Sequence, residues 1–177
     1  DITDENVDCV VRGGELLDQS LMARKLADLP LGVFAAPAYL AREGTPEHPL
    51  ELQDSHHRVV AFLWARTGKP LPYTLHNGTE RLHIMGRHVL VVDDGNAYLA
   101  AGLAGIGVLW LPTYMSDAHV ARGELVQLFE GWQLESMPLY LAYPPNRHVS
   151  LKLRVFIDWV VGLMAAGAPI VTHQSRP

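Results

Sequence analysis

Short apolar segments, bounded by glycine, proline or charged residues, alternate along this chain with segments of helical character. A continuous apolar run of four to eight residues, rich in β-branched side chains, predicts a buried strand. The predicted strands are residues 7–11, 21–26, 31–35, 59–64, 88–92, 108–111, 125–129 and 139–143. This alternation of strands with helices is typical of an α/β sheet that has helices on its faces.

Helix signals stand between these strands and after the last of them, over residues 36–42, 97–104, 113–122 and 150–164, with one helical turn near 49–52. Residues 65–80, rich in glycine and proline, predict a hairpin or an irregular excursion. In the last helix one apolar stripe is expected to dock on a core; it consists of Val155, Phe156, Trp159, Val160 and Leu163. The final residues, 165–177, lack a pattern and read as a tail.

The composition excludes several classes of protein. With 177 residues, of which 49 % are hydrophobic and 19 % charged, the chain can fill the core of one domain or of two small lobes. Its net charge, 14 − 19 = −5, disfavours a nucleic-acid surface. Cys9, the sole cysteine, excludes an internal disulfide and a multi-thiolate metal site. An acidic start and the lack of a long apolar run predict a soluble, cytoplasmic protein without a membrane span.

Motifs for catalysis or for a cofactor are weak. Gly102, Gly105 and Gly107 close a predicted helix, whereas a dinucleotide fingerprint opens one. The histidines lack the spacing of metal ligands, and no Gly-x-Ser-x-Gly elbow is present. The paired Asp93 and Asp94 are best explained as helix caps. We therefore expect no enzyme activity, no metal and no cofactor.

Two segments predict ligand binding. The Asp94-Gly95-Asn96 turn precedes a buried helix whose first backbone amides can hold a small anion. Arg12 and Gly13 stand at the carboxyl end of a predicted buried strand, where ligands collect in α/β sheets.

Five segments, taken in order, resemble the effector-binding domain of LysR-type transcriptional regulators. They are residues 8–26 (DCVVRGGELLDQSLMARKL), 36–41 (APAYLA), 92–95 (VDDG), 103–112 (LAGIGVLWLP) and 143–148 (YPPNRH), the last followed by a terminal amphipathic helix. The similarity extends from about residue 1 to about residue 164. Each segment alone is modest, and their order makes the match specific.

The resemblance implies an α/β fold like that of type II periplasmic binding proteins, with two Rossmann-like lobes joined by two crossover strands around a cleft. Lobe I is then expected over residues 1–36 and 140–164, lobe II over 37–139, and a tail over 165–177. Family members begin with a winged helix-turn-helix domain and a linker helix, which we do not find here. The strand, helix and second strand with which such an effector domain normally starts are not found either, so the resemblance implies a truncated first lobe.

The function that this resemblance implies is the sensing of a small-molecule effector between the lobes, without catalysis. Self-association to a dimer or tetramer is expected, with DNA contacted only through the domain that precedes lobe I, and no membrane contact. The expected ligand-binding residues are Arg12, Gly13, Ala36, Val60, Ala61, Phe62, Asp94, Gly95 and Asn96. A free-standing solute-binding protein of the same architecture is the alternative, and a small α/β enzyme is a third.

Overall fold

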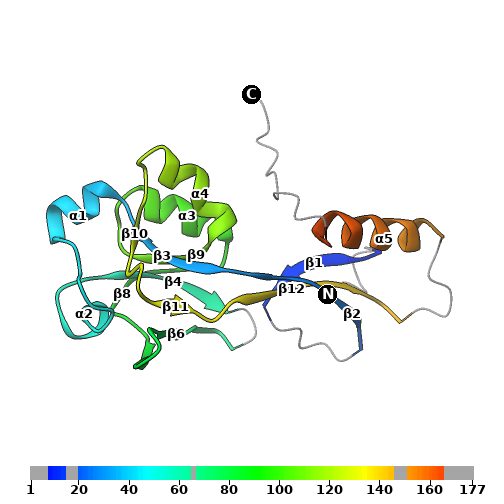
Figure 1. Cartoon of the computed structure of the whole chain (residues 1–177), viewed down its shortest axis with the longest axis horizontal. Coiled ribbons are helices and arrows are strands. Elements are labelled where there is room, and N and C mark those ends of the chain that lie inside the picture. Colours follow the sequence, from blue (N-terminus) through cyan, green and yellow to red (C-terminus); the bar gives the residue numbers. More distant parts are fainter. Residues whose placement is uncertain (1–7, 15–19, 65–66, 146–150, 166–177) are drawn as a thin grey trace. The chain divides into compact units, whose positions relative to one another are not determined.

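A computed structural model describes residues 8–14, 20–64, 67–145 and 151–165 (Figure 1). The chain divides into two compact units, the first formed by residues 1–29 and 137–177 and the second by residues 30–136. The lobe boundaries expected from the sequence, after residues 36 and 139, lie a few residues further along the chain than the boundaries of these units. The expected lobe ranges stay a prediction.

The second unit is built on a mixed sheet. Strand β3 (Leu31–Ala35) lies between β9 (Leu109–Pro112) and β10 (Val126–Leu128), antiparallel to both. Strand β4 (Val59–Trp64) runs parallel to β8 (His88–Val92) and antiparallel to the short β5 (Lys69–Pro70). A parallel bridge between Val59 and Val108 joins these two groups, and the Val60 amide donates to the Val108 carbonyl at 2.8 Å.

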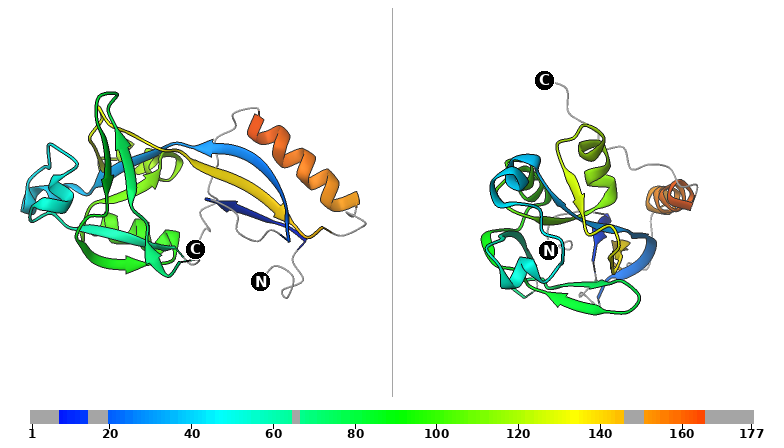
Figure 2. Two further views of the ribbon diagram at one scale, coloured as in Figure 1. Left: turned by 90° about the horizontal axis from the view of Figure 1, so that it is seen from below. Right: turned by 60° about the vertical axis from the view of Figure 1, so that its left-hand side comes forward.

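Side chains alternate between the two faces of this sheet and fill two separate cores. Phe34, Val60 and Leu109 pack on the face that carries α3 (Gly95–Leu103) and α4 (Thr113–Ala121). Val33, Val59 and Val108 pack on the other face. That face is covered by α1 (Pro37–Glu43), α2 (Glu51–Asp54) and the hairpin of β6 (Tyr73–His76) and β7 (Arg81–Ile84), and β11 (Gln133–Leu134) pairs with β6 (Figures 1 and 2).

The first unit contains an antiparallel sheet in the order β1 (Val10–Gly13), β12 (Met137–Tyr143), β2 (Met22–Leu29). Helix α5 (Leu151–Ala165) packs against β2. Leu141, Ile157 and Val160 form the centre of this smaller core.

Much of the predicted secondary structure is confirmed. The strands expected over 31–35, 59–64 and 88–92 have these bounds in the structure. The expected hairpin begins inside 65–80 and extends to Ile84. Parts of three predictions lie outside the described residues. They are the start of the first strand (within residues 1–7), the start of the last helix (Ser150) and the tail (166–177).

Two predictions are wrong. The first strand is not buried on both faces: it begins at Val10, and Val11 is 49 % exposed. Among the described residues β1 lies at the edge of its sheet, paired with β12. The docked face of α5 is also different. Of the predicted stripe only Val160 is buried, whereas Val155 and Trp159 are 60 % and 59 % exposed. The helix is apolar on more than one side, so periodicity alone does not select the side that meets the sheet.

Candidate functional site

One edge of the sheet in the second unit gathers several of the predicted ligand-binding residues. Because β4 and β8 are parallel, their carboxyl ends meet there, and Phe62 lies beside Val92 in the pairing. Asp94 follows β8 and begins α3. The structure therefore brings Phe62 together with the turn that contains Asp94, Gly95 and Asn96.

Asp94 acts as the N-cap of α3. Its backbone is extended (φ −115°, ψ 132°), and its Oδ1 accepts a hydrogen bond from the Ala97 amide at 2.8 Å. An aspartate in this position satisfies one of the free amides and complements the positive end of the helix dipole. The carboxylate thus occupies one of the amides that were expected to hold a bound anion.

Below this edge lies an aromatic group that periodicity did not reveal. The Phe62 and Tyr98 rings meet edge to face at 5.6 Å, and the Tyr73 and Trp110 rings stack at 4.3 Å. The Tyr98 hydroxyl accepts a hydrogen bond from the Trp110 amide at 3.0 Å. Burial raises the pKa of Tyr98 well above its ordinary value, and the neighbouring Tyr73 contributes to this shift. Tyr98 and Trp110 are each 3 % exposed, so this uncharged group is part of the core that supports the edge rather than a surface for a ligand.

Val60 and Ala61 are part of the support for this edge rather than of its surface. Val60 is fully buried and belongs to the core beneath α3, and Ala61 is 5 % exposed. Their contribution to ligand binding stays a prediction.

Ala36 lies at the opposite edge of the same sheet. Strand β3 runs antiparallel to β9, and β9 follows the direction of β4, so the end of β3 points away from the end of β4. The structure does not bring Ala36 together with Phe62 or Asp94. Ala36 instead lines an open surface hollow of about 620 Å³ between α1 and the ends of α3 and α4.

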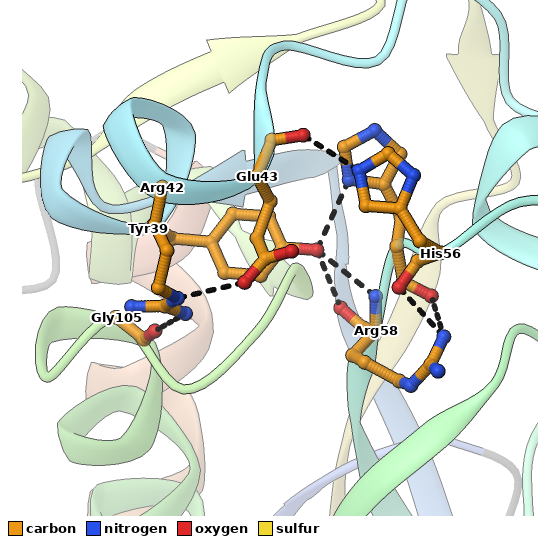
Figure 3. Close-up of polar contacts among 7 residues, drawn as sticks. Tyr39, Arg42, Glu43, His56, Arg58 and Gly105 are labelled. Carbon is orange, nitrogen blue, oxygen red and sulfur yellow. Dashed lines mark hydrogen bonds and ion pairs between the residues drawn. The ribbon is translucent and has the colours of Figure 1, made fainter.

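Helix α1, which begins directly after Ala36, is fixed by a polar network around Tyr39 (Figure 3). The buried Tyr39 hydroxyl accepts from the Arg58 amide at 2.9 Å and lies 3.1 Å from Nδ1 of His57. Arg42 donates to the Gly105 carbonyl at 3.0 Å, which ties α1 to the turn after α3. Burial lowers the pKa of His57, and the adjacent His56 lowers it further, so the network favours the neutral form of His57.

Arg12 and Gly13 belong to the first unit. Arg12 lies opposite Tyr140 in the pairing of β1 with β12, is exposed, and forms no ion pair with the described residues. A side chain at Gly13 would place its Cβ 2.8 Å from the Met137 Cε. Gly14 ends the strand with φ +85°, and its amide donates to the Pro138 carbonyl at 2.8 Å. Arg12 is therefore an exposed cation near the end of β1.

Metal binding and membrane spanning find no basis in the described part of the chain. No group of three or more histidine, cysteine, aspartate or glutamate side chains is placed to hold a metal ion among those residues. None of the helices described there has the length and apolar character that crossing a membrane requires.

The relationship to known proteins agrees with this architecture. The family model of the LysR substrate binding domain matches residues 1–165. The chain belongs to this family. An HTH-type transcriptional repressor of Pseudomonas aeruginosa is 31 % identical over 169 residues, which cover 96 % of this chain and 53 % of that protein. The HTH-type transcriptional regulator PtxR of the same species is 33 % identical over 161 residues, or 89 % of this chain and 49 % of PtxR.

Solved structures show the same fold. The regulatory domain of CrgA, a LysR-type transcriptional regulator from Neisseria meningitidis, matches with a TM-score of 0.74 and 28 % identity, over 92 % of this chain and 78 % of that domain. The LysR substrate-binding domain described here thus has the mixed α/β, type II periplasmic-binding-protein-like fold, and it is an effector-sensing regulatory domain. The chain spans about half the length of the curated relatives that it matches.

Proposed function

We propose that this domain binds a small anionic effector and that the protein containing it uses this binding to regulate transcription. The observation that carries the proposal is the match of the LysR substrate-binding domain to residues 1–165. The relatives named above are transcriptional regulators, so the comparisons give no support to a free-standing solute-binding protein. The proposed role requires no reaction, because an effector that prefers one of two conformations shifts their populations by binding alone.

Arg12 supports an anionic effector. Its guanidinium is exposed and forms no ion pair with the described residues. A free guanidinium can bind a carboxylate through two parallel hydrogen bonds. In the second unit, Phe62 and the turn of Asp94, Gly95 and Asn96 supply an apolar surface and exposed polar groups at one sheet edge.

The partners of the whole protein follow from the same proposal. A net charge of −5 makes this domain a poor DNA ligand, so contact with DNA belongs to a helix-turn-helix domain like those named for the relatives. Self-association to a dimer or tetramer would transmit the effector signal between copies. A protein of this kind acts in the cytoplasm, where its DNA is.

The test begins with a thermal-shift screen of small carboxylates against the protein that contains this domain. An effector at 100 times its Kd adds about 2.7 kcal/mol of stability. Isothermal titration of the best compound then compares the wild type with Arg12→Ala and with Arg24→Ala, an exposed arginine on β2 of the same sheet. We expect Arg12→Ala to weaken binding by at least about tenfold and Arg24→Ala to leave it unchanged. Equal affinity in all three proteins removes Arg12 from the site, and a screen without any binder contradicts the proposed function.

A further inference from the structure

The surface hollow at Ala36 is assembled from three segments that are far apart in the chain. Its apolar lining comes from Ala36, Pro37 and Ala38 at the start of α1 and from Leu103 at the end of α3. Its polar lining comes from His119, Arg122 and Glu124, at the end of α4 and in the loop that follows. A volume of about 620 Å³ lies within the range of small-molecule sites.

Strand pairing and hydrogen bonds hold the walls of the hollow in place. Strand β10, which follows Glu124, pairs with β3, and Val126 lies opposite Ala35. The Glu124 amide donates to the His119 carbonyl at 2.8 Å, which closes the turn after α4. The Arg42 hydrogen bond to Gly105 joins α1 to the end of α3 (Figure 3). The hollow is therefore preformed, and a ligand would not have to order its walls.

Its three polar side chains form one cluster, with Glu124 as the shared acceptor. Oε2 of Glu124 lies 2.6 Å from Nδ1 of His119 and 2.8 Å from one terminal nitrogen of Arg122. These two contacts hold the pKa of Glu124 down at about 2, so its carboxylate is ionised at neutral pH. An ionised acceptor at this distance requires the proton on His119 Nδ1, so that in a neutral ring Nε2 is left with a lone pair.

Arg122 is only partly used by this cluster. A guanidinium has five N–H donors. One terminal nitrogen donates to Glu124 Oε2 at 2.8 Å and also lies 3.0 Å from His119 Nδ1, which has no lone pair for it because its proton is directed at Glu124. The donors on the Nε and on the other terminal nitrogen form no hydrogen bond with the described residues, and half of the side chain is exposed. Glu124 thus orients the arginine while leaving its remaining donors for an anion.

We propose that this hollow is a second small-molecule site, which takes a small monocarboxylate with an apolar body. The carboxylate would bind the free donors of Arg122, and the body would cover the Ala36, Pro37 and Leu103 surface. This site lies wholly within the second unit and requires neither Arg12 nor the aromatic edge at Phe62. It would allow a second metabolite to act on the domain independently of the effector.

The proposal is tested by methyl NMR with hydrocinnamate, a phenyl ring on a short chain that ends in a carboxylate, and with its neutral amide as the matched probe. Saturable shifts of the Ala36, Ala38 and Leu103 methyl signals are expected with the acid and at least about tenfold weaker binding with the amide. Arg122→Ala should cause the same loss, and Ala38→Phe, at an exposed position, should block the hollow. Arg81→Ala, which removes an exposed arginine on β7, should leave the titration unchanged.

Several results would overturn the proposed second site. Absence of saturable shifts at these methyl groups overturns the proposal, as does equal binding of acid and amide or an Arg122→Ala protein that binds like the wild type. Arg12→Ala provides the separation from the proposed function, because the hollow should still bind hydrocinnamate in that variant. Binding that disappears with Arg12→Ala would assign the signal to the effector site and would also overturn the proposal.

Discussion

Replacement of Tyr39 by phenylalanine is the sharpest test of how the second unit is held together. The ring of Tyr39 is 1 % exposed, and Tyr39→Phe preserves its apolar contacts while removing the hydroxyl alone. That hydroxyl accepts from the Arg58 amide at 2.9 Å and lies 3.1 Å from His57 Nδ1. It is also 3.3 Å from the Arg58 carbonyl.

The expected cost follows from which partners stay satisfied. The Arg58 carbonyl also accepts from the Val108 amide at 2.9 Å, so it remains paired. The Arg58 amide and His57 Nδ1 lose their partner, and an unpaired buried polar group costs about 1–3 kcal/mol. We therefore expect Tyr39→Phe to lower the free energy of unfolding by about 2–4 kcal/mol, a large share of the stability of a typical domain.

Urea unfolding followed by circular dichroism measures this loss, and hydrogen exchange of the Arg58 amide locates it. Tyr114→Phe is the matched control, because Tyr114 is 37 % exposed on α4 and its change should stay within about 0.5 kcal/mol. The Arg58 amide should lose protection in Tyr39→Phe and keep it in Tyr114→Phe. Equal stability of the two variants, with the Arg58 amide still protected, would refute the reasoning.

Three further predictions concern the buried histidine, the cluster at the hollow and the core of the first unit. Burial lowers the pKa of His57, so the neutral side chain contributes its full share of the folding stability above pH 6.5, the ordinary pKa. This share is lost as the pH falls through the lowered pKa of the folded protein. An NMR titration midpoint of His57 at or above 6.5 would contradict the prediction. The carboxyl carbon of Glu124 should titrate near pH 2 and move toward 4.5 in Arg122→Ala, whereas an unchanged midpoint would show that the arginine is not responsible. Ile157→Ala should lower the free energy of unfolding in urea by about 2–5 kcal/mol, because the side chain is 6 % exposed. Val155→Ala, at 60 % exposure, should lower it by about 0.5 kcal/mol or less. Similar losses in the two variants would show that α5 docks through the face predicted from the sequence.

The sequence was sufficient for elements whose apolar pattern has one interpretation. The run at 59–64 has the length and β-branched content of a buried strand, and β4 has these bounds. Asp94 was predicted as a cap from its place before an apolar helix, and it accepts the Ala97 amide. Helix α5 shows the limit, because apolar residues lie on more than one of its sides and only packing against β2 decides which of them is buried.

Features that depend on distant segments were beyond the sequence. The hollow combines residues 36–38 with Leu103 and with residues 119–124, and no local pattern links these positions. The Tyr73 and Trp110 stack likewise joins a hairpin to β9. Ala36 was expected in the effector site, yet the direction of β3 carries it to the opposite sheet edge from Phe62. Strand direction, which hydrophobic patterns do not encode, is the missing information.

Control of DNA binding by an effector is the central claim, and one measurement tests it directly. The affinity of the full-length regulator for its operator DNA is measured at fixed salt, with and without the carboxylate found by the thermal-shift screen, in the wild type and in Arg12→Ala. The account predicts that the carboxylate changes the operator affinity or the footprint of the wild type and has a much weaker effect on Arg12→Ala. A compound that binds the domain tightly yet leaves operator binding unchanged in the wild type would contradict the account.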